Sequence, residues 1–247
     1  MNRREHFEQD GFVSVLSFCD TDELQTIESE LDRFIAERVP VLPPENIFYE
    51  DKADPSTLKQ IQRMHEHDDF FCDFFEGKPQ RLAEELLGEV VVGKNLQYFN
   101  KPPTFSEATP PHQDGFYFML KPCRALTMWM ALDMVDEENG CMRYVRNSHT
   151  RGMRSHGRTE TLGFSQGITD FGQSADSCEE VACPVQPGDL LAHHALTIHR
   201  ADVNSSANRH RRALGLIFYG KSAEENVVAH TAYQQQLTRE MTAKGKI

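Results

Sequence analysis

Two histidines and one aspartate have the types and the spacing that a bound metal ion requires. His112 and Asp114 are separated by one residue, and His199 lies far along the chain. If the first pair lies on a β-strand, both side chains point to the same face, because side chains alternate along a strand. A second histidine from a distant strand would complete three ligands. Two histidines and a carboxylate so arranged form the facial triad of non-heme Fe(II) oxygenases, which leaves coordination positions open.

The surroundings of the triplet favour this interpretation over a chance match. The chain has 11 histidines, so an isolated His-x-Asp triplet could be a set of ordinary hydrogen-bonded residues. Here Pro110 and Pro111 precede His112 and hold the chain extended at that point. His199 follows residues 187–194, which read as a turn and a buried strand.

Four other histidines compete for the role of the second imidazole ligand. By strand alternation one of His193 and His194 faces the interior, but an inward histidine is more often hydrogen-bonded than metal-bound. The position of His199 relative to the arginines that follow it favours His199. His65 and His67 precede an acidic and aromatic helix, and we interpret them as surface or packing residues.

Three arginines follow His199 at positions 209, 211 and 212. Residues 213–219 after them have the composition of a buried strand. A buried strand that opens with arginine normally needs an anionic partner, because an unpaired charge is costly to bury. A dicarboxylate cosubstrate would supply that anion.

Taken in order, these segments resemble the phytanoyl-CoA dioxygenase family of Fe(II)/2-oxoglutarate oxygenases, and especially its subgroup of phytanoyl-CoA dioxygenase domain-containing proteins. The similarity runs nearly from end to end, and it rests on the order and spacing of the segments together. The matching segments are residues 7–13, the helix from Asp22, and residues 100–103, 111–114, 129–132, 138–142, 147–149, 188–189, 199–204 and 211–213.

The resemblance implies one iron ion, 2-oxoglutarate as cosubstrate and O2 as oxidant. The residues that would bind Fe(II) are His112, Asp114 and His199. Arg211 is assigned to the distal carboxylate of 2-oxoglutarate, because residues 211–213 match the Arg-x-Ala step of the family. A guanidinium also matches a carboxylate bidentately. Arg212 would then point outward, and Arg209 falls too early.

The resemblance assigns three further residues to the cosubstrate pocket: Lys59, Gln97 and Trp129. A solvated lysine and an ordinary core tryptophan are the alternatives for two of them. Two positions depart from the family pattern. Ala201 stands where a serine is common, which removes one hydroxyl contact to the cosubstrate, and Arg146-Asn147 replaces a Pro-Gly pair.

We expect a single domain over residues 1–247, mainly β with α-helices. Residues 1–88 should form a helical layer, since apolar residues recur there at helical spacing. Residues 89–247 contain short apolar runs separated by Gly, Pro and Asn, a pattern typical of sandwiches and barrels. For this core the family implies a double-stranded β-helix, a cupin-like jelly roll. The polar segment 150–182 should be a long loop at the active-site rim that orders when substrate binds.

Composition limits the partners. The formal net charge of -12 disfavours a nucleic-acid surface, which needs a basic stripe. The six cysteines are scattered and give no zinc signature. No apolar run approaches the ~18 residues of a membrane span, and no secretory leader is visible at the start. We therefore expect a cytoplasmic enzyme that acts on a small molecule.

The reaction implied by the resemblance is hydroxylation of an unactivated C–H bond in a small or lipid-like metabolite, with release of succinate and CO2. Halogenation is disfavoured, because Asp114 fills the position that a halide would need. Two other classes stay open: a cupin-like isomerase or hydrolase with the same ligands, and a non-catalytic module that binds the metal or 2-oxoglutarate. Arg211 and Lys59 argue against the first, and the intact triad argues against the second.

Overall fold

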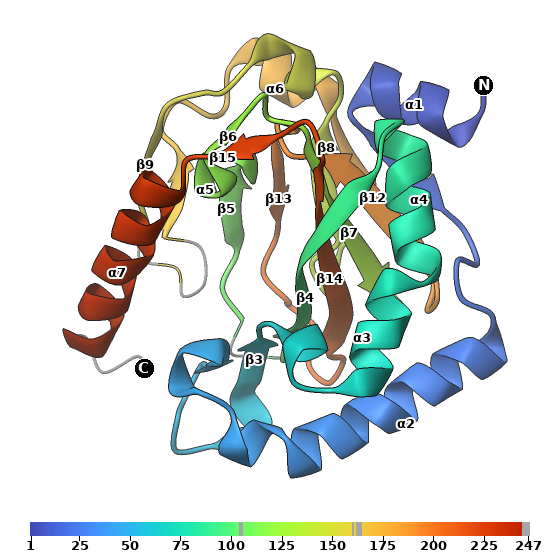
Figure 1. The fold of residues 1–247 in the computed structure, drawn as a ribbon, viewed down its shortest axis with the longest axis vertical. Helices are drawn as coiled ribbons and strands as arrows, with labels where there is room; N and C mark the ends of the chain where they lie inside the picture. The colour runs from blue at the N-terminus through green and yellow to red at the C-terminus, as the bar shows by residue number, and fades with distance from the viewer. Residues whose placement is uncertain (104–105, 160, 162–164, 244–247) are drawn as a thin grey trace.

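The chain folds into two β-sheets, with a layer of helices on the outer side of the larger sheet (Figure 1). This computed structural model describes residues 1–103, 106–159, 161 and 165–243. The paired strands of both sheets run antiparallel. The predicted jelly-roll core with N-terminal helices is confirmed.

The larger sheet has seven strands in the order β1-β12-β7-β14-β4-β3-β2. In that order they span Phe12–Val15, Leu190–His194, Ala125–Ala131, Arg211–Gly220, Val91–Lys101, Leu58–Ile61 and Ile47–Tyr49. The smaller sheet has the order β11-β8-β13-β5, with strands Glu180–Cys183, Met142–Val145, His199–Ala201 and Thr109–His112. Two short ribbons pair β9 (His156–Arg158) with β10 (Gln166–Ile168), and β6 (Leu120–Lys121) with β15 (Glu224–Glu225).

Strand β7 illustrates why the larger sheet is buried on both faces. All of its residues are buried. Two of its methionines, Met128 and Met130, belong to the core under the helices, whereas Trp129 lies in the second core between the sheets. This follows from the alternation of side chains along a strand. Thr127 also points between the sheets, and its hydroxyl is used in the site described below.

Four helices cover the outer face of the larger sheet: α1 (Arg3–Asp10), α2 (Thr21–Glu37), α3 (Asp69–Glu76) and α4 (Lys78–Leu87). Helix α2, the helix expected from Asp22, begins with an acidic cap. The Asp20 carboxylate accepts from the Glu23 N–H at 2.9 Å, and the Glu23 carboxylate accepts from the Asp20 N–H at 3.0 Å. This reciprocal pair is a capping box. Short 3-10 helices lie at Val39–Val41, Pro44–Asn46, Pro55–Thr57, Met64–Glu66 and Ser148–Arg151.

Three segments differ from what the sequence patterns suggest. The polar region 45–67 contains β2 and β3, which extend one edge of the larger sheet. The segment 150–182, expected to be a long loop, contains β9, β10 and α6 (Ser174–Glu179). The C-terminal helix α7 (Val227–Ala243) was not predicted. Its described side chains are exposed or only partly buried, so no apolar stripe marks the helix in the sequence.

His194, at the end of β12, gives a pH-dependent contribution to stability. Its ring lies 6.2 Å from the Phe7 ring and 5.6 Å from the His149 ring, between α1 and the sheet. Burial, reinforced by His149, lowers the pKa of His194 to about 4. An unfolded histidine has a pKa of ~6.5, so the unfolded chain binds this proton first, and folding loses stability as the pH falls from ~6.5 towards 4.

We therefore expect His194→Gln to flatten the acid side of the stability curve. Between pH 6.5 and 4.5 the wild type should lose up to about 1.4 kcal/mol per pH unit more than the variant. Urea unfolding at several pH values measures this difference. Parallel stability curves for the two proteins would contradict the assigned pKa.

Candidate metal centre and cosubstrate pocket

His112 and His199 face each other across neighbouring strands. Strand β5 ends at His112, β13 begins at His199, and the two residues are register partners with ring centroids 4.1 Å apart. The Nδ1 atoms lie 2.8 Å and 3.0 Å from the carbonyl oxygens of Pro110 and Thr197. Because a carbonyl oxygen only accepts, each Nδ1 carries the hydrogen. The Nε2 lone pairs are then available to a metal.

Asp114 reaches the same point by a route that the sequence argument did not foresee. It lies beyond the end of β5, with helical backbone angles (φ -57°, ψ -33°), at the start of α5 (Gly115–Phe118). The argument from strand alternation was therefore wrong, although the two side chains do meet. A tight turn brings them together, and it needs Gly115, because a Cβ there would lie 2.6 Å from Cys123 Sγ.

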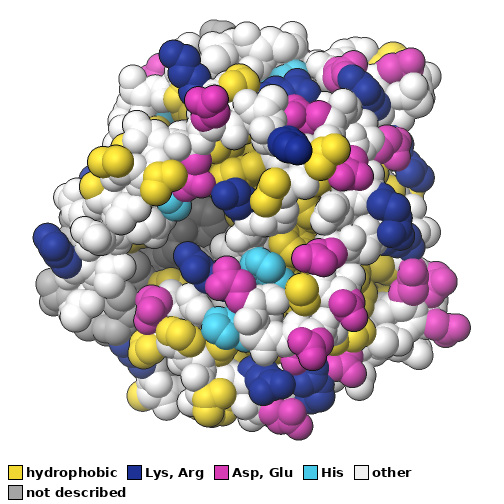
Figure 2. All heavy atoms as spheres, viewed as in Figure 1, with side chains coloured by type: hydrophobic (Ala, Val, Ile, Leu, Met, Phe, Trp, Pro, Cys, Tyr) yellow, Lys and Arg dark blue, Asp and Glu magenta, His cyan; other side chains and the backbone are white. Residues whose placement is uncertain are grey.

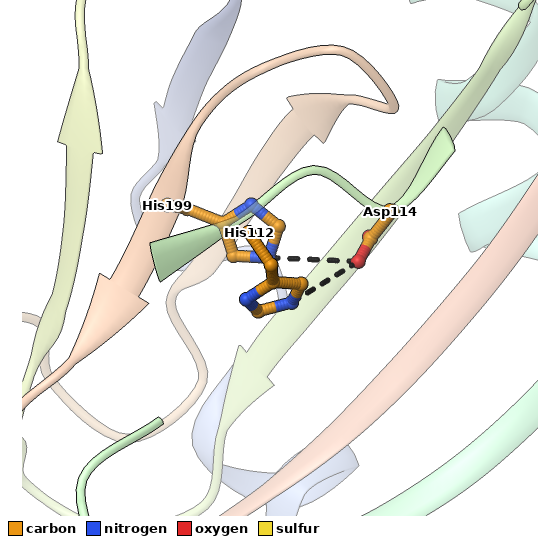
Figure 3. Close-up of side chains that lie close together, drawn as sticks. All are labelled: His112, Asp114 and His199. Atoms are coloured by element: carbon orange, nitrogen blue, oxygen red, sulfur yellow. Dashed lines mark ion pairs between the residues drawn. The ribbon is translucent and has the colours of Figure 1, made fainter. Parts of the chain in front are cut away.

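The three side chains converge on one point (Figure 3). Oδ1 of Asp114 lies 3.4 Å from His112 Nε2 and 3.6 Å from His199 Nε2, and one ligand atom from each residue lies within 4.8 Å of the others. Neighbouring ligand atoms that are each ~2.1 Å from one ion lie roughly 3 Å apart. The donor set of two imidazoles and one carboxylate therefore fits a single divalent metal.

Burial and mutual charge set the protonation of this group. Burial alone would raise the pKa of Asp114, but the neighbouring imidazoles, His199 first and then His112 and His193, hold it well below its usual value. Burial, followed by the neighbouring imidazoles, lowers the pKa of His199 well below its usual value. An ionised carboxylate and a neutral imidazole are the forms that bind a metal.

Arg211 is a buried cation without a counter-ion in the described part of the chain. Its side chain is 5% exposed, Nη1 donates to Gly140 O at 2.9 Å, and Nε has no partner there. The guanidinium lies 5.1 Å from the centre of the Trp129 ring. Burial lowers the pKa of Arg211 to about 10, which leaves it charged at neutral pH. An unpaired buried cation of this kind calls for an anionic ligand.

Lys101 lies close to Arg211, and Lys59 lies close to Lys101. Burial, followed by the charges of Arg211 and Lys59, lowers the pKa of Lys101 well below its usual value. Lys101 Nζ donates to the carbonyl oxygens of Glu107 at 2.5 Å and Asp202 at 2.9 Å. Lys59 Nζ lies 2.8 Å from a carboxylate oxygen of Glu50. An anion bound beside these three basic side chains would favour the charged form of Lys101.

The predicted cosubstrate residues occupy neighbouring positions in the larger sheet. Gln97 and Trp129 are both register partners of Gly215, on either side of β14. Gln97 accepts from the Gln60 side chain at 2.7 Å. Lys59 lies where the register between β2 and β3 shifts, so it comes from an irregular part of its strand.

The other two arginines of the cluster have partners elsewhere. Arg212 pairs with Asp133 at 2.7 Å and Glu28 at 2.9 Å, and Arg209 pairs with Asp136 at 2.9 Å. These pairs agree with the expectation that Arg212 points away from the pocket.

The structure accounts for both departures from the family pattern. Ala201 is 1% exposed and packs in the core between the sheets. Asn147 takes a left-handed backbone (φ +55°) before the turn at residues 148–151, a conformation that asparagine tolerates better than most residues.

The middle residue of the triplet ties the segment 150–182 to the metal-binding strand. The fully buried Gln113 donates to Gly152 O at 2.9 Å and Leu196 O at 2.7 Å, and accepts from the Arg154 N–H at 2.8 Å. Its backbone N–H donates to His156 Nε2 at 3.1 Å. The start of the segment thus lies at the edge of the site. Its ordering by substrate stays a prediction.

Sequence reasoning did not assign roles to Gln60, Lys101, Thr127 or Gln113. Lys101 carried a usable signal, because it lies four residues after Gln97 and therefore shares its face of β4. His193, which was not assigned as a metal ligand, lies beside the site: its Nε2 is 3.1 Å from Asp114 Oδ2. Strand alternation alone could not say what an inward His193 would contact.

Comparison with known proteins identifies the family. The profile of the family described as Phytanoyl-CoA dioxygenase (PhyH) matches residues 7–213. The chain belongs to this family. It is 23% identical to the mouse (Mus musculus) peroxisomal phytanoyl-CoA dioxygenase over 257 residues, which covers 98% of this chain and 74% of the relative. It is 31% identical to the bovine (Bos taurus) phytanoyl-CoA dioxygenase domain-containing protein 1 over 154 residues, covering 61% and 53%.

Solved structures agree on the fold. The epimerase SnoN in complex with Fe3+, alpha ketoglutarate and nogalamycin RO superposes with a TM-score of 0.73 at 24% identity, covering 90% of this chain and 84% of SnoN. EvdO2 from Micromonospora carbonacea var. aurantiaca, complexed with 2-oxoglutarate, gives 0.71 at 24% identity, covering 90% and 91%. With its family and its His-Asp-His group, the chain is a 2-oxoglutarate-dependent non-heme iron oxygenase. No helix in the described residues is long and apolar enough to cross a membrane.

Removal of one ligand should abolish metal binding and leave the fold intact, because the apolar core and not the metal holds the sheets together. We expect Asp114→Ala to weaken Fe(II) binding by more than ~100-fold, beyond the 10–100-fold cost of disturbing an outer-shell partner. Anaerobic titration measures the affinity, and thermal unfolding without metal checks the fold. Asp73→Ala, an exposed aspartate on α3, serves as the matched control. Wild-type affinity in Asp114→Ala would refute the ligand set.

Proposed function

We propose that this chain couples the oxidative decarboxylation of 2-oxoglutarate to hydroxylation of a C–H bond in a small molecule. His112, Asp114 and His199 would bind Fe(II), and Arg211 would bind the distal carboxylate of the cosubstrate. The reaction consumes substrate, O2 and 2-oxoglutarate and gives hydroxylated product, succinate and CO2. The observation that carries the proposal is that Arg211 is buried without a counter-ion in the described residues, in the same interior that holds the His-Asp-His group.

The residues of the pocket would select and orient the dianion. Arg211 offers a planar fork to one carboxylate, and Trp129 holds that guanidinium from one side. Burial and the nearby Arg211 and Lys59 disfavour the charged form of Lys101, and a bound dianion would favour it. Gln97 with Gln60 supplies neutral amide groups. Bound iron would supply the O2 chemistry that side chains lack. The surrounding buried residues would keep water from the reaction.

Aromatic residues near His112 would form the substrate side. The Tyr117 ring centroid lies 6.0 Å from that of His112, and Phe116 stacks on His156 at 4.4 Å. Tyr233 of α7 lies 6.4 Å from Tyr117. Figure 2 shows a hollow in the face of the molecule beside α7. Phe118, Leu120 and Tyr98 belong to core clusters and are not available to a substrate. These contacts support a small substrate with apolar surface.

Epimerisation is a second candidate outcome. SnoN is described as an epimerase, and SnoK as a non-heme alpha ketoglutarate dependent carbocyclase, so this fold is used for more than one reaction.

The proposal also places the protein in the cytoplasm and gives it no nucleic-acid partner. Both statements rest on the net charge of -12 and on six free cysteines.

The decisive experiment combines binding with product detection. Without O2, Fe(II) and 2-oxoglutarate should bind together, the second tightly only after the first. With O2, a screen of metabolites should yield at least one that raises succinate release severalfold and is itself altered. A cupin-like isomerase or hydrolase that does not use 2-oxoglutarate would turn over without it, and a binding module would release no succinate with any compound. Either result would reject the proposal.

The arginine assignment has its own test. Arg211→Ala should weaken 2-oxoglutarate binding by about 2–5 kcal/mol, the usual cost of breaking a buried, hydrogen-bonded charge pair. Arg212→Ala is the matched control, because its guanidinium is paired with Asp133 and Glu28. Calorimetric titration of both variants with Fe(II) present gives the ranking. If Arg212→Ala lost more affinity than Arg211→Ala, the anchor would be Arg212.

A further inference from the structure

Asp114 has one oxygen turned to the other two ligands and one turned away. Its Oδ1 faces the Nε2 atoms of His112 and His199. Its Oδ2 accepts from the Thr127 hydroxyl at 2.5 Å and lies 3.1 Å from His193 Nε2. Thr127 and His193 are register partners on β7 and β12, so two adjacent strands aim both donors at the same oxygen.

His193 is in turn held by a second buried polar residue. Its Nδ1 lies 3.1 Å from the hydroxyl of Tyr144, on β8 of the opposite sheet. His193 is 1% exposed and Tyr144 is fully buried. The Tyr144 ring stacks on Phe12 at 4.6 Å, which fixes its orientation. Polar groups buried this deeply are costly unless each is hydrogen-bonded.

The Asp114 carboxylate at one end and the Tyr144 hydroxyl at the other fix the direction of these hydrogen bonds. A carboxylate oxygen only accepts, so His193 Nε2 carries the hydrogen that faces Asp114. If the ring is neutral, Nδ1 must accept, and the Tyr144 hydroxyl donates to it. The alternative, a ring with both hydrogens, would leave the hydroxyl hydrogen of Tyr144 buried with no acceptor in the described residues. Tyr144 therefore donates to His193, and His193 donates to Asp114.

We propose that Tyr144 and His193 are positioning residues that hold Asp114 as a one-oxygen ligand. With Oδ2 fixed by His193 and Thr127, the carboxylate cannot rotate to bring both oxygens to the metal. A position that a second carboxylate oxygen would fill then stays open for the cosubstrates. The inference rests on the proposed metal centre. It adds the residues that set the Fe(II) affinity of that centre and the number of open coordination positions.

The test compares three substitutions that differ in what they remove. Tyr144→Phe removes one hydroxyl, His193→Phe removes both ring nitrogens at similar volume, and His193→Gln keeps an amide donor. The matched control is His194→Gln, on the neighbouring residue, whose ring lies near Phe7 and His149 instead. Anaerobic titration gives Fe(II) affinity, and the visible absorption of the Fe(II)–2-oxoglutarate complex reports its ligand arrangement. Thermal unfolding without metal checks that each variant folds.

We expect Fe(II) affinity to fall ~10–100-fold in His193→Phe, the usual effect of removing an outer-shell partner. The loss should be smaller in Tyr144→Phe, partly restored in His193→Gln, and absent in His194→Gln, with the visible band shifted in His193→Phe. Unchanged affinity and spectrum in both His193→Phe and Tyr144→Phe would overturn the inference. A second result would also overturn it: Fe(II) affinity falls in His193→Phe, is unchanged in Tyr144→Phe and is not restored in His193→Gln. That result would make His193 a direct ligand. Wild-type protein that bound no Fe(II) would instead refute the proposed function.

Discussion

The site depends on the pairing of β5 with β13, which brings two imidazoles face to face inside a closed pair of sheets. His199 is the register partner of both His112 and Tyr144, so one row of the smaller sheet carries three of the polar groups. The opposing row of the larger sheet carries His193 and Thr127. Asp114 lies between the two rows and contacts groups from both. A slip of one residue in either register would turn these side chains to the wrong face.

Charge is distributed unevenly along this interior. The ionised carboxylate of Asp114 lies at the metal end, while Arg211 and Lys101 are register partners at the far end of β14 and β4. Between them the Phe99 ring covers Gly215, where a Cβ would lie 2.5 Å from a Phe99 ring carbon. Like charges buried side by side destabilise the protein until an anion joins them. The pairing of β14 with β4 thus supports the proposal that a dianion binds here.

Sequence patterns were informative where one residue acts through its own strand or helix. The helix from Asp22 was expected from the sequence, and the resemblance to the family selected Arg211 and turned Arg212 outward. The route of Asp114 was not expected, because a turn and a strand can both bring residues two apart together. The contacts of His193 and Lys101 depend on which strands become neighbours across the sheet, which spacing along one strand does not encode. Helix α7 lacks an apolar stripe, so periodicity had nothing to detect.

Gln113, the middle residue of the triplet 112–114, has a structural role of its own. Gln113 is fully buried, and its amide is saturated by backbone groups of Gly152, Arg154 and Leu196. Arg154 continues outward to Asp176 at 2.8 Å, so hydrogen bonds lead from the metal-binding strand to α6. An amide that satisfies three backbone groups is costly to replace. The base of the segment 150–182 is therefore fixed together with the ligands. The β9–β10 ribbon is anchored at the same place, because its first residue, His156, accepts from the Gln113 N–H at 3.1 Å.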